Sequence, residues 1–267
     1  MTTIKELMSL KGRRALITGA TGGLGKVMAV TLAELGADLV LVDRPGSDFE
    51  NLRTTLVERW DVKVQHCFCD LEQQEQRTEL IDWLKNSGEG LAILINNAAF
   101  VGASELPGWA VPFEEQTIDT WRRALEVNLT AVFALCQGLS PMLKAAKGAS
   151  IINIASIYGE YGPDWSLYEG TSMSNPAAYG ASKGGLIQLT RWLATTIAPS
   201  VRVNSISPGG VFRNQAEVFV KRYEARTPLG RMATEDDFCG VVAYLASDLS
   251  KYVTGQNLSV DGGWGVW

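Results

Sequence analysis

Tyr179 and Lys183 are the side chains of this sequence whose types and spacing best suit proton transfer. Residues four apart lie on one face of an α-helix, a turn from each other. A phenol has a pKa of about 10 in water, which is too high for a base at neutral pH. A neighbouring ammonium group would stabilise the phenolate and lower that pKa. The pair therefore predicts a general acid–base catalyst, and a solvated helix face is the alternative.

A glycine-rich segment, Thr18 to Gly25, follows a predicted strand and opens a predicted helix. Gly19 permits a tight turn, Gly23 lets the backbone approach a pyrophosphate, and Gly25 lets the helix pack closely on the strand. The N-terminus of a helix also favours an anion. Asp43 stands 24 residues beyond Gly19, close to the spacing of about 20 that is typical of a ribose-binding acid. The pattern predicts a dinucleotide site.

Asp43 also indicates which dinucleotide to expect. A carboxylate accepts hydrogen bonds from the ribose 2′- and 3′-hydroxyls and repels a 2′-phosphate, so NAD is expected and NADP is less favoured. The neighbouring Arg44 could accommodate a 2′-phosphate, but we interpret it as a solvated charge at the end of a strand.

Short apolar runs recur along the chain, with helical stretches between them. The candidate strands are Ala15–Thr18, Leu39–Asp43, Val62–Cys69, Leu91–Asn96, Ser150–Ile154, Val201–Ile206 and Asn257–Val260. Several are continuous apolar runs, which is typical of strands buried on both faces of a parallel sheet. Strand–helix alternation without a linker or repeat predicts a single domain over residues 1–267. We expect a doubly wound Rossmann-type α/β fold with a predominantly parallel seven-stranded sheet and helices on both faces.

Three segments are expected to form loops around a substrate, at about 100–116, 157–178 and 210–230. The first two leave the carboxyl ends of central strands, where ligands bind in open α/β sheets. The second carries aromatic residues, whose flat faces suit sugar rings. Packing of this insert onto the body, or onto a neighbouring subunit, explains the same residues equally well.

The third segment carries a group of basic residues, namely Arg213, Lys221, Arg222 and Arg226. Such a run is usually a solvated face, but it could also bind a carboxylate or phosphate of the substrate.

Composition excludes several classes of protein. The 267 residues carry a net charge of −5, which argues against a nucleic-acid binder. No apolar run approaches the roughly 18 residues that would cross a bilayer, and no secretory signal is visible, so we expect a cytoplasmic protein without a membrane partner. The four cysteines form no CxxC motif and the chain has a single histidine, so no metal site is expected.

Taken together, these motifs resemble those of the short-chain dehydrogenase/reductase family. The matching elements are the glycine loop, Asp43, Asp70-Leu71, Asn96-Asn97-Ala98, Asn128, Ser156, Tyr179-x-x-x-Lys183 and Pro208-Gly209. They arrive in family order from residue 12 to the end of the chain, so the resemblance covers essentially the whole sequence.

The resemblance implies a role for each catalytic candidate. Tyr179 would be the general acid/base, and Ser156 would donate a hydrogen bond to the substrate oxygen. Lys183 would bind the nicotinamide ribose and, together with the positive charge of an oxidised nicotinamide, lower the pKa of Tyr179. Asn128 would hold a water in a proton relay.

The resemblance also implies a set of cofactor contacts. Asp70 and Leu71 would flank the adenine, Asn97 would lie against the adenosine ribose, and Val211 would reach the carboxamide. The complete expected cofactor-binding set is Gly19, Thr21, Gly23, Leu24, Gly25, Asp43, Asp70, Leu71, Asn97, Ala98, Tyr179, Lys183, Pro208, Gly209 and Val211.

The sequence departs from the family pattern at three places. Ala99 replaces a glycine and adds a methyl group, which is tolerable at negative φ. The threonine that often follows the Pro-Gly turn is replaced near Arg213, so contacts to the carboxamide would come from the backbone. Ser156 and Tyr179 lie 23 residues apart, which is longer than usual for the family.

Two other functions were weighed. Gly180 to Gly184 matches the G-x-S-x-G motif of hydrolases, but that motif needs a preceding strand and a later histidine, and the only histidine, His66, comes earlier. A nucleotide-binding regulator without turnover is the second candidate. The favoured function is oxidation of a secondary alcohol or reduction of a ketone, with a sugar, sugar acid or polyol as substrate, by a homotetramer.

Overall fold

The computed structural model describes residues 2–100 and 106–267, so part of the expected loop 100–116 lies outside the described residues. The strands are β1 (Arg14–Thr18), β2 (Asp38–Asp43), β3 (Val64–Phe68), β4 (Ile93–Asn96), β5 (Ala149–Ile154), β6 (Val201–Pro208) and β7 (Asn257–Val260). The helices are α1 (Ile4–Met8), α2 (Gly23–Glu34), α3 (Glu50–Trp60), α4 (Gln74–Asn86), α5 (Ile118–Leu125), α6 (Ala131–Ala145), α7 (Ala177–Thr196), α8 (Glu217–Arg226) and α9 (Cys239–Ala246).

One parallel sheet carries the strands in the order β3-β2-β1-β4-β5-β6-β7. The chain enters at β1, runs out to the edge at β3, and returns to β4 on the other side of β1. The strand order therefore reverses between β1 and β4, which is where ligands bind in sheets of this kind. The expected doubly wound fold is confirmed, and every strand pair is parallel.

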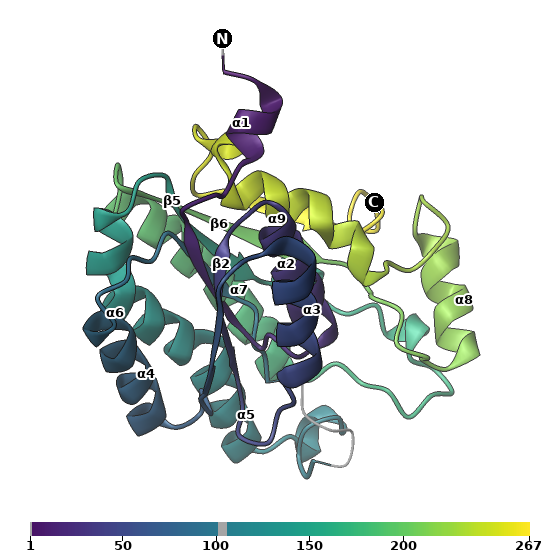
Figure 1. Cartoon of the computed structure of the whole chain (residues 1–267). Helices are drawn as coiled ribbons and strands as arrows, with labels where there is room; N and C mark the ends of the chain where they lie inside the picture. Colours follow the sequence, from purple (N-terminus) through teal and green to yellow (C-terminus); the bar gives the residue numbers. More distant parts are fainter. Residues whose placement is uncertain (1, 101–105) are drawn as a thin grey trace.

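The apolar runs are buried on both faces of the sheet because neighbouring residues point to opposite sides. In β1, Ile17 packs with α2, α3 and α9, whereas Leu16 packs with α4, α6 and α7. Figure 1 shows the two helical layers on either side of the sheet, with α8 standing apart from both.

Several strands differ from the expected bounds by a few residues, β3 among them, and a long helix that the sequence also predicts over Thr117–Leu143 is interrupted. The edge strand β3 is Val64–Phe68 rather than Val62–Cys69, because it pairs only with β2 and has no neighbour on its other side. The stretch Thr117–Leu143 is not one α-helix, since a π-helical turn at Glu126–Thr130 separates α5 from α6. Over the described part of the chain, the helices are too short or too polar for any of them to span a bilayer.

Candidate active site

A cleft of about 1160 Å³ opens at the carboxyl ends of the strands, across the point where the strand order reverses. Its lining includes all of the residues expected to bind a cofactor, together with Ser156. Asn128 does not line it. Residues at or after the carboxyl ends of the six strands β1 to β6 thus come together at one end of the sheet.

The glycine loop is shaped by the close approach of backbone to backbone. A Cβ on Gly25 would stand 2.0 Å from the carbonyl oxygen of Gly19, so the start of α2 could not approach β1 with any larger residue. Gly19 has a φ of +63°, and a Cβ there would stand 2.9 Å from the Cα of Ala98. No side chain caps the N-terminus of α2. These features fit a dinucleotide whose pyrophosphate lies at a helix N-terminus.

Asp43 lies at the end of β2 and holds the glycine loop from the side. Its Oδ2 accepts hydrogen bonds from the Thr21 backbone N–H at 2.9 Å and from the Thr21 hydroxyl at 2.7 Å. Its Oδ1 accepts from the backbone N–H of Arg44, whose side chain is exposed. The carboxylate is therefore fixed at the edge of the cleft.

Asn97 and Thr18 join the glycine loop to the segment after β4. The Asn97 side-chain amide donates to the carbonyls of Thr18 and Gly19 at 2.9 and 3.0 Å, and the Thr18 hydroxyl accepts from the backbone of Asn97 and Ala98. The amide of Asn97 thus positions the loop, a role that the sequence did not indicate. The contribution of Thr18 was also missed, because a threonine at a strand end gives no distinct signal.

Tyr179 and Lys183 lie one turn apart in α7, as the spacing predicts. Lys183 is 2% exposed, its Nζ donates to the Ile154 carbonyl at 2.7 Å, and it lies 5.7 Å from the centroid of the Tyr179 ring. Ser156 follows β5 and hydrogen-bonds to Tyr179. The Ser156 hydroxyl, the Tyr179 phenol and the Lys183 ammonium group therefore lie together in the cleft.

Both ionisable groups are shifted against their charged forms. Burial raises the pKa of Tyr179, and the hydrogen bond from Ser156 only partly opposes this. Burial lowers the pKa of Lys183 to about 8. Burial of Tyr179 in the chain alone thus acts against the phenolate. The lowering of its pKa by Lys183 together with an oxidised nicotinamide stays a prediction.

Asn128 lies in the π-helical turn and is fully buried. Its Oδ1 accepts from the Phe100 backbone N–H at 2.6 Å, and its Nδ2 donates to the Ser182 hydroxyl at 3.0 Å. Asn128 thus joins the segment after β4 to α7, which carries Tyr179. The expected water-holding role stays a prediction.

Comparisons with known proteins agree with this geometry. A family model described as enoyl-(acyl carrier protein) reductase matches residues 19–265. A tropinone reductase homologue of Arabidopsis thaliana is 34% identical over 269 residues, which is 97% of this chain and 94% of the relative. The chain belongs to the short-chain dehydrogenase/reductase family. It is an NAD(P)-dependent oxidoreductase.

Solved structures of the family superimpose over nearly the whole chain. A gluconate 5-dehydrogenase of Burkholderia cenocepacia, in complex with NADP and tartrate, is 30% identical with a TM-score of 0.84, covering 99% of this chain and 100% of that one. An NAD⁺-bound xylitol dehydrogenase is 28% identical with a TM-score of 0.82, covering 95% of this chain and 99% of that one. Relatives thus bind either nicotinamide cofactor.

In this dehydrogenase/reductase the aromatic insert packs on its own chain. Its rings meet the buried Trp264 near the C-terminus, 6.5 Å from Tyr158 and 6.1 Å from Tyr161 between centroids. Tyr158 and Tyr168 also line the cleft and share a hydrogen bond of 2.6 Å between their hydroxyls. The insert therefore does both things that the sequence left open, packing on the body and lining the cleft.

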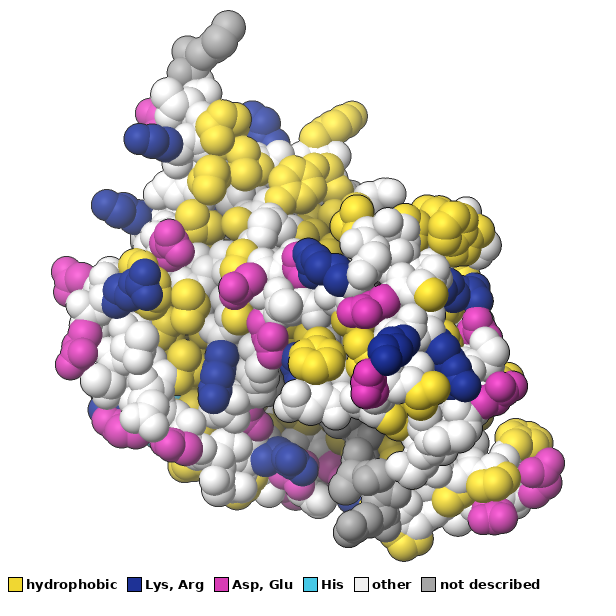
Figure 2. Space-filling model, turned by 90° about the vertical axis from the view of Figure 1, so that its right-hand side faces the viewer, with side chains coloured by type: hydrophobic (Ala, Val, Ile, Leu, Met, Phe, Trp, Pro, Cys, Tyr) yellow, Lys and Arg dark blue, Asp and Glu magenta, His cyan; other side chains and the backbone are white. Residues whose placement is uncertain are grey.

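The four basic residues of the third segment do not come together as one anion site, because each has its own partner in the chain. Arg213 pairs with Glu235 at 2.7 Å, Lys221 pairs with Glu217 at 2.6 Å, and Arg226 pairs with Asp164. Arg222 donates to the Glu169 carbonyl at 2.6 Å. Figure 2 shows the face that carries α8, where basic and acidic side chains are interspersed. The solvated-face interpretation holds for Lys221, and the other three bind neighbouring groups of the chain.

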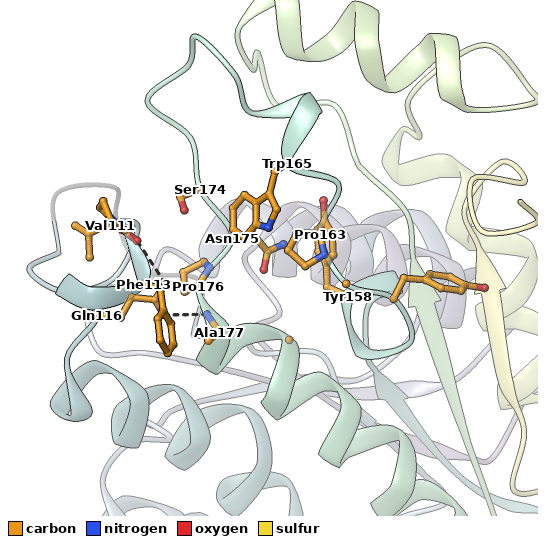
Figure 3. A pocket seen from close by; sticks show the side chains of 14 residues that line it. Val111, Phe113, Gln116, Tyr158, Pro163, Trp165, Ser174, Asn175, Pro176 and Ala177 are labelled. Carbon is orange, nitrogen blue, oxygen red and sulfur yellow. Dashed lines mark hydrogen bonds between the residues drawn. The ribbon is translucent and has the colours of Figure 1, made fainter.

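A second hollow of about 380 Å³ adjoins the cleft and shares Tyr158, Ser174, Asn175 and Pro176 with it. Figure 3 shows Phe113 and Gln116 on one side of the hollow, and Trp165 and Asn175 on the other. The Gln116 amide bonds to the backbone N–H of Ala177 at 3.0 Å, at the start of α7. The first two expected substrate loops thus lie side by side.

Proposed function

We propose that this enzyme interconverts a secondary alcohol and a ketone, with Tyr179 as the general acid/base. The observation that carries the proposal is the meeting of Tyr179, Ser156 and Lys183 in the cleft that the glycine loop borders. A nicotinamide cofactor would supply or accept the hydride. It would be held by the glycine loop, Asp43, Asp70, Leu71, Ala98 and the Pro208 to Val211 segment.

The side chains divide the remaining work. In oxidation, Ser156 holds the substrate oxygen by a hydrogen bond while Tyr179 takes the hydroxyl proton. Lys183 is held by the Ile154 carbonyl, so its charge stays close to the Tyr179 ring. In reduction the same tyrosine returns the proton to the oxygen.

We propose NAD as the preferred cofactor. The carboxylate of Asp43 is fixed at the rim of the cleft by Thr21, and a 2′-phosphate there would meet a like charge. The exposed Arg44, next in the sequence and also lining the cleft, is the opposing influence.

The NAD preference is tested by comparing kcat/KM for NAD and NADP in the wild type and in Asp43→Ala. We expect the wild type to have the higher kcat/KM with NAD. Asp43→Ala should reduce the ratio of the two kcat/KM values at least about tenfold, because the repulsion between the Asp43 carboxylate and a 2′-phosphate is removed. Asp48→Ala, an exposed acid nearby that does not line the cleft, should leave the ratio unchanged. Equal use of both cofactors by the wild type would contradict the proposal.

The substrate that the cleft suits best is an uncharged polyol or sugar. The Tyr158 and Tyr168 hydroxyls offer hydrogen bonds near Tyr179, while Phe219 and Met232 give the wall apolar faces. The basic residues that could have bound a sugar acid are engaged elsewhere, as described above.

The decisive experiment follows the absorbance of reduced nicotinamide in the purified enzyme with a panel of polyols, sugars, cyclic alcohols and the corresponding ketones. Turnover that is lost in Tyr179→Phe supports the proposed function. Saturable NADH binding without turnover of any compound would favour a nucleotide-binding regulator instead.

We also propose that the protein forms a homotetramer in the cytoplasm. Its only other partner would be a small-molecule alcohol or ketone. Large apolar side chains are exposed on two consecutive helices. They include Phe133 of α6 and Trp192 of α7, which are 41% and 52% exposed. Burial of such residues between subunits is the usual way to remove them from water.

A further inference from the structure

An ion pair covers the glycine loop at the start of α2. Arg213 and Glu235 are joined by a 2.7 Å contact, and both reach over Gly23. A Cβ on Gly23 would stand 2.7 Å from Nη2 of Arg213 and 2.8 Å from Oε1 of Glu235. The two side chains therefore occupy the exposed side of Gly23, beside the N-terminus of the helix.

The backbone holds Arg213 in this place. Residues Val211 and Ala233 form an isolated parallel bridge, and the Phe212 N–H donates to the Ala233 carbonyl at 2.9 Å. The Arg213 N–H donates to the Gln215 side chain at 2.7 Å. The loop after β6 is thus fastened beside the segment that carries Glu235, which in turn packs on α2.

A contribution to the stability of the fold does not account for the ion pair between Arg213 and Glu235. The side chains of Arg213 and Glu235 are 44% and 33% exposed, and exposed ion pairs contribute little to folding. The positive end of α2 favours a negative charge, so the Glu235 carboxylate occupies a place that an anionic ligand would also favour. A planar guanidinium in the same place suits a phosphate, which it can bind through two N–H groups.

We propose that Arg213 is a cofactor-binding residue that exchanges Glu235 for the pyrophosphate of the dinucleotide. In the free enzyme, Glu235 holds the guanidinium over Gly23. When the dinucleotide enters, its pyrophosphate takes the place of the Glu235 carboxylate on Arg213. The carboxylate and the pyrophosphate thus compete for one cation, so Glu235 weakens cofactor binding while it keeps Arg213 in position.

The test measures ligand binding by calorimetry, without turnover, so its outcome is independent of the substrate and of the proposed reaction. ADP carries the pyrophosphate and adenosine does not. In Arg213→Ala we expect the Kd for ADP to rise about tenfold or more, since charge-assisted hydrogen bonds are lost. The Kd for adenosine should change by less than about twofold. The ADP affinity should also depend less on salt.

Glu235→Gln tests the competition directly. Removing the carboxylate should lower the Kd for ADP several-fold and leave that for adenosine unchanged. Lys221→Ala removes one positive charge from an exposed pair that does not line the cleft, and should alter neither Kd. Thermal unfolding shows whether each variant is folded.

Three results would overturn the proposal. One is wild-type affinity for ADP in Arg213→Ala. Another is an equal loss of ADP and adenosine binding in that variant, which would indicate a structural role. The third is weaker ADP binding in Glu235→Gln, which would mean that the ion pair itself builds the site.

Discussion

At the residue scale, burial acts against the charged forms of Tyr179 and Lys183, the proposed catalytic pair. Burial raises the pKa of Tyr179 and lowers that of Lys183, so in the chain alone each group is pushed toward its neutral form. A phenolate at neutral pH therefore needs positive charge from outside the chain, such as the ring of an oxidised nicotinamide.

Replacing Tyr179 by phenylalanine removes one oxygen and should spare the fold. We expect kcat to fall about 10²–10⁴-fold, which is the usual contribution of general acid–base catalysis to the rate. The Kd for NADH should change by less than about twofold. Steady-state kinetics and fluorescence titration measure the two. Tyr252→Phe, at a fully exposed tyrosine, is the matched control and should behave as wild type. Near-wild-type turnover in Tyr179→Phe would show that the acid/base is a different residue.

Lys183 should lower the free energy of unfolding by an amount that depends on pH. Its pKa falls from the ordinary 10.5 to about 8 in the folded chain, so between these values the unfolded chain binds more protons and stability rises with pH. Below pH 8 the full penalty applies, about 3 kcal/mol at most. Lys183→Met should therefore be more stable than wild type at pH 7, and the gap should narrow toward pH 10.5.

Denaturant unfolding of both proteins across this pH range gives the difference. Lys144→Met, at an exposed lysine of α6, should show no such pH-dependent gain. A Lys183→Met protein that is less stable than wild type at pH 7 would mean that the bond to the Ile154 carbonyl outweighs the desolvation of the ammonium group.

At the element scale, the π-helical turn between α5 and α6 places Asn128 in contact with two other segments. The turn holds Asn128 between the backbone of Phe100 and the hydroxyl of Ser182, which itself donates to the Tyr179 carbonyl at 2.8 Å. One side chain thus joins the loop after β4 to the first turns of the catalytic helix. Asn128 therefore acts by positioning α7, since it does not itself line the cleft.

Asn128→Ala should destabilise the protein by about 1–3 kcal/mol, because buried polar groups on Phe100 and Ser182 lose their partner. Chemical denaturation should show this as a lower midpoint with an unchanged slope. Asn86→Ala, at an exposed position of α4, is the control. A variant of wild-type stability would refute the bridging role.

At the scale of the whole molecule, the described chain leaves large apolar side chains in water. Trp267 near the C-terminus is 73% exposed and Trp192 on α7 is 52% exposed. Isolated exposed apolar residues are normal, but two tryptophans together with Phe133 amount to surface that a partner subunit could cover.

Sedimentation at micromolar concentration should therefore give a tetramer, or at least a dimer. Trp192→Glu should shift the species toward a smaller one, because a charge would be buried between subunits. Phe113→Glu, which alters an exposed aromatic near the loop after β4 instead of on these helices, should leave the assembly unchanged. A wild-type monomer would disprove the assembly.

The sequence by itself determined the elements and the site that arise from local pattern. The continuous apolar runs of β1, β2 and β4 predicted a buried parallel sheet, since each residue faces one helical layer or the other. Gly19, Gly25 and Asp43 predicted the dinucleotide site, because their spacing is fixed by one strand, one turn and one helix.

The tertiary structure alone decided what depends on contacts between distant segments. Arg226 meets Asp164 across 62 residues and Arg213 meets Glu235 from another loop, so a run that looked like one basic patch became a set of separate pairs. The pKa values of Tyr179 and Lys183 depend on burial, which no spacing reveals. A helical period cannot show a π-turn either, and so the partners of Asn128 appeared only in the fold.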